Sequence, residues 1–412
     1  MSKMNFSGDK AYTFLEKIAI PRRTGSEGNV EVFNTINDEL KNYGYEIEIN
    51  KYEYIHTYLR ELLIVKLGIV IFFFIMIVSS FSAYFSDIIP LIILCIISII
   101  SAAIQATLMV YNLAGRFTHY LKQKFSEKIP PEEELELPIA KNIIVKKYPQ
   151  NKTQNKNDLH IIIGAHYDSI SINYHYLVYA IIYLICILGS IFLGIYFIIF
   201  DILLISIIYS ELIELLFTTS IFLASVVSVC MIMWLRVNLK NESQGASDNA
   251  SGVSILMELA RILKDIDLNF KLTMIFFGVE EEGLLGSISY VKSNLELLKT
   301  EKVMMLSLDT LGIGSKLKCM SGHGFRKKYD KELLDKLKNS ADKLKIELKR
   351  QWFLYPSSDH APFVFSGFSA TQLFNKLIMA NTKQDKIDKI NKNTLETTGK
   401  LVLQFLMDLN ES

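Results

Sequence analysis

Five residues of the types that bind divalent metal ions stand in separate polar segments of this chain. Imidazole nitrogens and carboxylate oxygens are common ligands of zinc in proteins. The five residues are His166, Asp248, Glu281, Asp309 and His360. Two histidines and three acids suffice for two ions, each with one histidine and one acid of its own and the third acid as a bridge. This composition is typical of a two-metal hydrolytic site, in which a water between the ions becomes a nucleophile at neutral pH.

Each motif taken alone indicates little. A pair such as His166 and Asp168 is common on surfaces and in satisfied cores, and the acidic run 280–282 is typical of a solvated turn or helix start. An acid at a strand end, such as Asp309, is usually a turn residue. His323 is interpreted as a loop histidine between glycines. The occurrence of all five candidates in order, each in a matching local context, favours the metal site.

Three short apolar runs end at these candidates and would position them. They are LHIIIGAH (159–166), LTMIFFGVEE (272–281) and VMMLSLD (303–309). Runs of this length that are rich in β-formers predict buried strands. In an open α/β sheet, ligands bind outside the carboxyl ends of the strands, so three strands would deliver metal ligands to one rim.

The two remaining candidates lie outside these runs. The segment GASDNASG (245–252) opens an apolar pattern with helical spacing over 255–263, which places Asp248 just ahead of a helix. His360 follows a Pro-Ser-Ser turn signal and is expected in a loop.

The five segments together resemble the co-catalytic zinc metallopeptidases of family M28, typified by bacterial leucyl aminopeptidases. Glutamate carboxypeptidases and glutaminyl cyclases are relatives. The segments are GAHYDS (164–169), GASDNASG (245–252), EEEGLLGS (280–287), SLDTLG (307–312) and SSDHAPF (357–363). Residues 21–48 are similar to the opening loop, helix and first strand of that family, and residues 385–409 to its closing helix. The resemblance implies an α/β fold of the zinc exopeptidase type, a three-layer αβα sandwich with a mixed central sheet.

The resemblance also implies two zinc ions, for which cobalt or manganese could substitute. His166 and Glu281 then fall on ligands of different ions, and Asp248 falls on the bridging carboxylate. Asp309 and His360 complete the two sets of ligands.

Further roles come from the same resemblance. Glu280 falls on the general base that takes a proton from the bridging water, and Asp168 falls on the acid that orients a ligand histidine. The bond between Asp248 and Asn249 is expected to be cis. The implied activity is that of an aminopeptidase that removes N-terminal residues from peptides.

Two long apolar blocks do not fit this family. They run from about Leu67 to Leu113 and from about Tyr174 to Leu235, and neither contains Lys or Arg. The first is split at 86–90 and the second near 201–214, so each half supplies about 20 residues, enough to cross a bilayer as a helix. We expect two transmembrane hairpins, four helices in all, inserted into the peptidase fold. A content of 50% hydrophobic residues and a mean hydropathy of +0.26 agree with a membrane protein.

The hairpins divide the chain into five segments. These are 1–61, 62–115 (first hairpin), 116–173, 174–236 (second hairpin) and 237–412. Each hairpin returns the chain to the side that it left, so His166 and Asp248 share one compartment although they flank the second hairpin. Only five residues separate Asp168 from the third span near Tyr174. Presentation of apolar substrates at the bilayer and simple anchoring are equally favoured as the role of the hairpins.

The charges near the spans indicate an orientation. Basic residues flank the spans on the catalytic side: Arg60, Lys66, Arg116, Lys122, Lys124, Arg236 and Lys240. The opposite turns are expected to carry only acids: Asp87, Asp201, Glu211 and Glu214. The positive-inside rule then predicts a multi-pass protein of the cell membrane whose catalytic part faces the cytoplasm. The polar N-terminus lacks the apolar core of a secretory signal, and three of the four cysteines lie in spans, so a disulfide framework is not expected.

Other classes are less favoured. The net charge of +1 is uninformative about nucleic acid, and no basic stripe with interleaved aromatic residues indicates it as a partner. The Lys-rich stretches 326–350 and 383–392 are interpreted as solvated helix faces. A glutaminyl cyclase and a non-catalytic scaffold of the same fold remain alternatives. A transporter is disfavoured because the spans are expected to lack interior ionisable residues, and Gln105 is expected to join helices by hydrogen bonding. The partners are then a peptide substrate and the bilayer, and the sequence specifies neither the oligomeric state nor the preferred first residue.

Overall fold

The structure is a computed structural model that describes residues 5–53, 57–113, 139–149, 159–206, 211–324, 327–353, 358–377 and 379–411. The described residues form two compact units. The α/β unit takes the described parts of 1–55, 119–172 and 239–412. The helical unit takes the described parts of 56–118 and 173–238.

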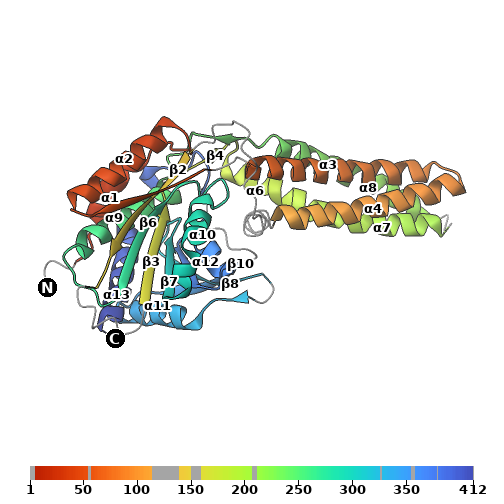
Figure 1. Cartoon of the computed structure of the whole chain (residues 1–412). Coiled ribbons are helices and arrows are strands. Elements are labelled where there is room, and N and C mark those ends of the chain that lie inside the picture. Colours follow the sequence, from red (N-terminus) through yellow and green to blue (C-terminus); the bar gives the residue numbers. More distant parts are fainter. Residues whose placement is uncertain are drawn as a thin grey trace. The chain divides into compact units, whose positions relative to one another are not determined.

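A nine-stranded mixed sheet forms the centre of the α/β unit (Figure 1). Its strands are β1 (Ile47–Glu53), β2 (Ile139–Lys147), β3 (Leu159–His166), β6 (Lys271–Phe277), β7 (Lys302–Leu308), β8 (Leu317–His323), β9 (Lys327–Lys328), β10 (Leu348–Phe353) and β11 (Ser369–Phe374). The order is β1-β2-β6-β3-β7-β11-β8-β10, with β9 paired to β8. The four central strands β6, β3, β7 and β11 are parallel, and in each of them every residue after the first is buried because both faces of the sheet are covered.

Helices cover both faces of this sheet. They are α1 (Gly8–Ile18), α2 (Glu27–Asn42), α9 (Ser251–Leu263), α10 (Leu285–Lys299), α11 (Lys331–Lys343), α12 (His360–Phe365) and α13 (Lys392–Glu411). Figure 1 shows α1, α2, α9 and α13 together on one face and α10 with α12 on the other. α9 packs on β6, β3 and β7, and all its residues but Arg261 are buried. The expected three-layer αβα sandwich with a mixed sheet is confirmed.

One local expectation within the α/β unit is wrong. His323 is the last residue of β8 and not a loop residue. It is held by pairing with β9 and by ring contacts with Tyr329 and Phe365.

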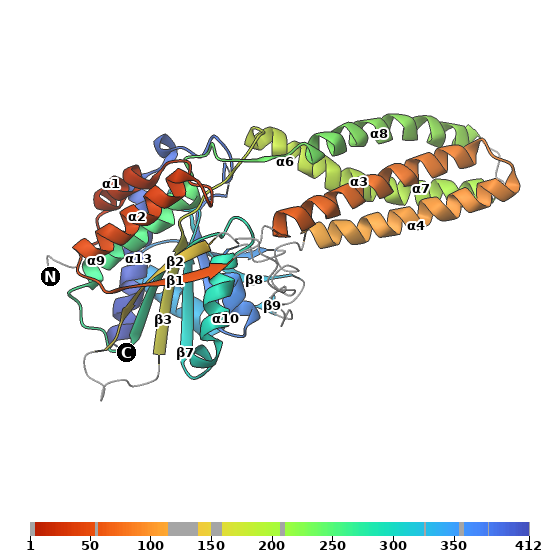
Figure 2. The ribbon, with the colours of Figure 1, turned by 45° about the horizontal axis from the view of Figure 1, so that its top comes forward.

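The helical unit consists of long apolar helices that run side by side (Figure 2). Its elements are α3 (Thr57–Tyr84), α4 (Ile88–Leu113), α6 (Tyr176–Leu184), the π-helical turn η2 (Ile185–Gly189), α7 (Ser190–Ile205) and α8 (Glu211–Leu235). Four segments are long and apolar enough to cross a membrane: Leu63–Tyr84, Ile88–Met109, Tyr176–Ile205 and Glu211–Leu235. The expectation of four such helices is confirmed.

The prediction that Asp201 lies in a turn between two spans is wrong. Asp201 lies inside α7, fully buried, because the apolar helical pattern continues past it to Ile205. Its Oδ2 accepts a hydrogen bond from Ser80 Oγ (3.1 Å), and Ser80 Oγ lies 2.7 Å from Ser98 Oγ. The described spans therefore contain an interior ionisable residue. The absence of such residues, which was the reason for disfavouring a transporter, does not hold.

Candidate metal centre

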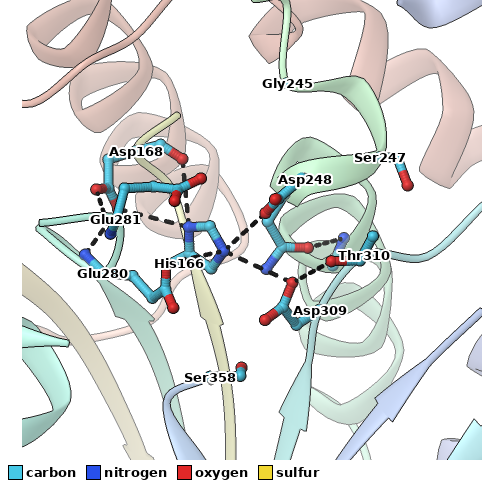
Figure 3. A network of polar contacts seen from close by, with 12 residues as sticks. His166, Asp168, Gly245, Ser247, Asp248, Glu280, Glu281, Asp309, Thr310 and Ser358 are labelled. Carbon is cyan, nitrogen blue, oxygen red and sulfur yellow. Dashed lines mark hydrogen bonds and ion pairs between the residues drawn. The ribbon is translucent and has the colours of Figure 1, made fainter. Parts of the chain in front are cut away.

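The carboxyl ends of three neighbouring parallel strands bring the expected ligands to one rim. His166 is the last residue of β3, Asp309 follows β7 directly, and Glu280 and Glu281 follow β6 after a two-residue turn. Asp248 lies just ahead of α9, in the kinked segment η3 (Ala246–Ala250), where Asp248 and Asn249 have non-helical backbone angles. The order β6-β3-β7 places the histidine between the glutamates and Asp309, as Figure 3 shows.

The ligand atoms form two overlapping groups around His166. The first contains His166, Asp248 and Glu281, and the second contains His166, Glu280 and Asp309. Within each group the ligand atoms all lie within 4.8 Å of one another. His166 Nε2 is 3.2 Å from Asp248 Oδ1, 3.7 Å from Asp309 Oδ1 and 3.8 Å from Glu280 Oε2.

This set of donors fits a divalent cation. All five side chains are buried, and the acids outnumber the histidine four to one. Buried carboxylates at this separation repel one another unless a cation or a proton neutralises them. Although burial opposes a charge on His166, the carboxylates around it raise the pKa of its imidazole well above the usual value. A metal ion would replace that proton, and one imidazole with carboxylates is a zinc-type donor set.

His360 stands outside both groups. It is the first residue of α12, which Asp359 directly precedes, rather than a loop residue. Its Nε2 lies 3.1 Å from Tyr329 Oη and 3.0 Å from Met320 Sδ. Burial lowers the pKa of His360 to about 3, so the imidazole is neutral, as a metal ligand must be. The role of His360 as a ligand stays a prediction.

Asp168 holds the glutamate turn against His166. Its Oδ1 and Oδ2 accept the backbone N–H groups of Glu280 and Glu281, both at 3.1 Å, and its Oδ1 lies 3.5 Å from His166 Nδ1. Burial favours the neutral acid, but these bonds and His166 hold the pKa of Asp168 below its usual value. Asp168 is therefore a carboxylate that fixes two candidate ligands and the candidate base at once.

The backbone around Asp248 has the expected form. The Asp248–Asn249 peptide bond is cis, which confirms that expectation. The Asn249 amide donates to Leu308 O (2.8 Å), and its Oδ1 accepts from Gly252 N (3.0 Å). These bonds join the turn ahead of α9 to the end of β7, next to Asp309.

Arg22 is a buried residue of the site that reasoning from the sequence missed. Its guanidinium donates to Tyr167 O (2.8 Å), Gln244 O (2.5 Å) and Gly245 O (2.8 Å). It thereby joins the segment that carries His166 to the segment that carries Asp248. Burial lowers the pKa of Arg22 to about 10, partly offset by nearby carboxylates.

Asp385 is the second missed residue, and its environment corrects the interpretation of 383–392 as a solvated helix face. Its carboxylate is fully buried and accepts from Ser247 N (2.7 Å) and Asp248 N (2.9 Å). The stretch around it contains only a three-residue 3₁₀ turn, Ile387–Lys389. Burial raises the pKa of Asp385 to about 7. Nothing in the sequence around this acid, which stands among lysines, predicts that its carboxylate is buried.

Comparisons with known proteins agree with this geometry. Residues 229–406 match the description of peptidase family M28. The chain is 31% identical over 173 residues to aminopeptidase YwaD of Bacillus subtilis (strain 168), which is 39% of this chain and 36% of that relative. The alignment thus spans about a third of the length of this curated relative.

Solved structures of the same fold are also similar. The aminopeptidase from Aneurinibacillus sp. strain AM-1 aligns with a TM-score of 0.57 at 16% identity, over 99% of this chain and 95% of that one. A glutaminyl cyclase from Bacteroides thetaiotaomicron aligns with a TM-score of 0.53 at 15% identity, over 99% of each chain. At these identities the likeness shows the fold alone.

Proposed function

Because residues 229–406 match peptidase family M28, we propose that the chain is a membrane-anchored metallo-aminopeptidase that hydrolyses N-terminal residues from peptides. The observation that carries the proposal is the pair of buried ligand groups that share His166 at one rim of the sheet. Zinc-dependent hydrolysis needs such a set of imidazole and carboxylate donors beside a base.

We assign the metal-holding residues from the resemblance to the family, which one of the buried groups supports. His166 and Glu281 would hold different ions, Asp248 would bridge the two ions, and Asp309 and His360 would complete the two sets of ligands. His166, Asp248 and Glu281 lie together in the first group. Two zinc ions, or cobalt or manganese in their place, would supply Lewis acidity and lower the pKa of a bound water.

We assign the proton transfers to Glu280. Glu280 is 2% exposed, its carboxylate lies in the second ligand group, and its backbone N–H is fixed by Asp168. Glu280 would accept a proton during attack on the scissile carbonyl and donate it to the leaving amine. Asp168 would hold His166 and the turn 280–281 in position, a role in which carboxylates often support ligand histidines.

The membrane part of the proposal has its own support. Four apolar helices provide the anchor, and basic residues flanking the spans favour a cytoplasmic catalytic part. A reporter fused after residue 412 tests the orientation. Green fluorescent protein should fluoresce and alkaline phosphatase should be inactive there, whereas the opposite pair of results would place the catalytic part outside.

The activity is tested with detergent-purified full chain whose bound metal is counted. Unblocked peptides should be cleaved from the N-terminus, and the same peptides with N-acetyl groups should not. Glu280→Gln should keep its metal but lose about 10²–10⁴-fold in kcat, the usual contribution of a general base. Glu296→Gln, at an exposed acid of α10, is the matched control and should behave as the wild type.

Two results would overturn the proposal. Pyroglutamate formation from a glutaminyl peptide without hydrolysis would assign the acyl-transfer chemistry of a glutaminyl cyclase. A folded protein that binds no metal and cleaves no peptide would assign a non-catalytic membrane scaffold.

A further inference from the structure

The buried carboxylate of Asp201 lies where three helices of the helical unit meet. Asp201 belongs to α7, Ser80 to α3 and Ser98 to α4, and each of the three residues is at most 1% exposed. Asp201 Oδ2 accepts from Ser80 Oγ (3.1 Å), which lies 2.7 Å from Ser98 Oγ. Gln105, by contrast, which the sequence predicts to join helices, has no hydrogen-bond partner for its Nε2 among the described residues. Oxygen atoms of three helices therefore gather around one carboxylate.

The second oxygen of this carboxylate, Asp201 Oδ1, lacks a donor. It is buried and has no hydrogen-bond partner among the described residues. A proton on Oδ2 would be shared with Ser80 but would leave Oδ1 as it is. Because buried polar atoms are normally paired, an unpaired one indicates a bound water or ion.

The charge of the carboxylate favours an ion over a water molecule. The described spans contain one basic residue, Lys66, which lies 14 positions before Ser80 on α3, about 21 Å away at 1.5 Å per residue. Acids inside membrane helices are rare, and they commonly pair with an opposite charge or mark an ion site. A water molecule would donate to Oδ1 but would leave the negative charge without a counter-charge.

The carboxylate lies close to one end of the bundle, where a cation would enter. Asp201 is four positions from Ile205, the last residue of α7, which corresponds to about 6 Å of helix. The described helix ends on this side carry three exposed acids, Asp87, Glu211 and Glu214. The apolar blocks that contain these ends have no Lys or Arg. Acids without intervening bases raise the local concentration of cations.

We propose that Asp201, Ser80 and Ser98 bind one monovalent cation, for which sodium is the probe. Hard cations take oxygen ligands in proteins, and each serine hydroxyl keeps lone pairs for the ion beside the hydrogen bond that it donates. One carboxylate balances one positive charge, whereas a divalent ion would leave a net charge in apolar surroundings. The bound ion joins α3, α4 and α7. The site is independent of the peptidase assignment.

The proposal is tested by replacing sodium at constant ionic strength. Full-length protein purified in detergent and choline chloride is titrated with sodium chloride, and bound radioactive sodium is counted beside the thermal midpoint. One sodium ion should bind per chain, and the midpoint should rise with sodium concentration because the ion binds the folded chain. Asp201→Asn should lose both effects, since the amide carries no charge. Because this variant also removes a buried acid, its midpoint in choline chloride should equal or exceed that of the wild type.

Matched serine variants separate this site from general effects of salt. Ser98→Ala removes one oxygen and should lower sodium affinity by about 10-fold or more, because loss of an outer partner of a metal already has an effect of this size. Ser225→Ala, at an exposed serine of α8 whose hydroxyl donates to Ile221 O (2.7 Å), should keep the affinity of the wild type.

Three results would overturn the proposal. The first is an equal midpoint in sodium and choline with no sodium bound. The second is sodium binding that persists in Asp201→Asn, which would place the ion elsewhere. The third is a midpoint that depends on pH in the same way in both salts and loses this dependence in Asp201→Asn, which would assign a proton to Asp201 in place of the cation.

Discussion

Asp385 fixes the backbone of Asp248 from 137 positions away in the sequence. The Asp385 carboxylate accepts the N–H groups of Ser247 (2.7 Å) and of Asp248 (2.9 Å), each with a different oxygen. The Asp248 carboxylate in turn lies 3.2 Å from His166 Nε2. The direction of the central candidate ligand therefore depends on a side chain from the segment that leads to α13.

Asp385→Asn is expected to weaken metal binding. The amide keeps one acceptor but turns its NH₂ group toward the second backbone N–H, so the turn at Asp248 loses a bond and gains a repulsive contact. Loss of an outer partner of this kind typically lowers metal affinity by about 10–100-fold. Competition with a chelator measures this, and Asp388→Asn, at an exposed acid three residues later, is the control. Unchanged metal affinity in the Asp385 variant would show that Asp248 is held by other contacts.

Arg22→Met is expected to destabilise the protein by about 3–5 kcal/mol. The variant removes a buried charge that donates to four carbonyl oxygens, those of Ile20, Tyr167, Gln244 and Gly245, and leaves these acceptors without their donor. Arg22→Lys should recover only part of the loss, because an ammonium cannot reproduce the planar fork of donors. Denaturant unfolding of the full chain measures both variants.

An exposed arginine provides the control for this prediction. The Arg350 side chain is 41% exposed and pairs at 2.6 Å with Asp335, which is itself 46% exposed, so Arg350→Met should cost about 1 kcal/mol or less. Equal losses of unfolding free energy in the two variants would mean that the buried hydrogen bonds of Arg22 contribute no more to stability than an exposed ion pair.

The part of the site that lies at strand ends was predictable from the sequence. β3, β6 and β7 are short apolar runs, and parallel strands place the residues at their carboxyl ends along one edge of a sheet. The sequence alone therefore placed His166, the glutamate pair and Asp309 together. The cis bond before Asn249 was expected from the resemblance of one segment, not from a physical argument.

The missed residues share a physical cause. Arg22 and Asp385 act through backbone groups of segments more than 130 residues away, and no local pattern encodes such a contact. Asp201 was predicted in a turn because an acid within an apolar run usually marks the end of a span. In the structure the Asp201 carboxylate is buried and accepts a hydrogen bond from Ser80, and the helix continues to Ile205. His360 was placed in a loop because a turn signal does not reveal that a six-residue helix begins directly after it.

Gly252→Ala is expected to disturb the contact between α9 and β7. A Cβ at this position would lie 2.2 Å from Leu308 O and 2.4 Å from Asn249 Oδ1, both closer than real contacts allow. The helix must then move away from the strand that ends next to Asp309. We expect a loss of about 1–3 kcal/mol, as for overpacking elsewhere, together with weaker metal retention.

A second substitution on α9 separates the steric effect from a general effect on the helix. Ser254 is buried, but its hydroxyl donates only to Ser251 O of the same helix (2.8 Å), so Ser254→Ala should change stability by about 1 kcal/mol or less. Thermal midpoints and metal counts of both variants give the comparison. A Gly252 variant as stable as the wild type would contradict the close approach of α9 to β7.

His160 is expected to make stability fall with acid. It lies at the start of β3, with Nδ1 2.6 Å from Glu301 Oε2 and Nε2 2.8 Å from Thr273 Oγ1. Burial, aided by Lys271, lowers its pKa from 6.5 to about 4, although Glu301 opposes the shift. Between these two values the unfolded chain binds more protons than the folded one, so stability is complete above pH 6.5 and decreases as the pH falls toward 4.

The size of this effect is about 3 kcal/mol at pH 4 and about 2 kcal/mol at pH 5, at 1.36 kcal/mol per pKa unit. His160→Gln keeps a donor and an acceptor but does not titrate. Unfolding of metal-free wild type and variant at pH 7.5 and pH 5 isolates the histidine from metal loss. The wild type should lose about 2 kcal/mol more than the variant on acidification. An equal loss in both proteins would mean that His160 binds its proton as readily in the folded chain as in the unfolded one.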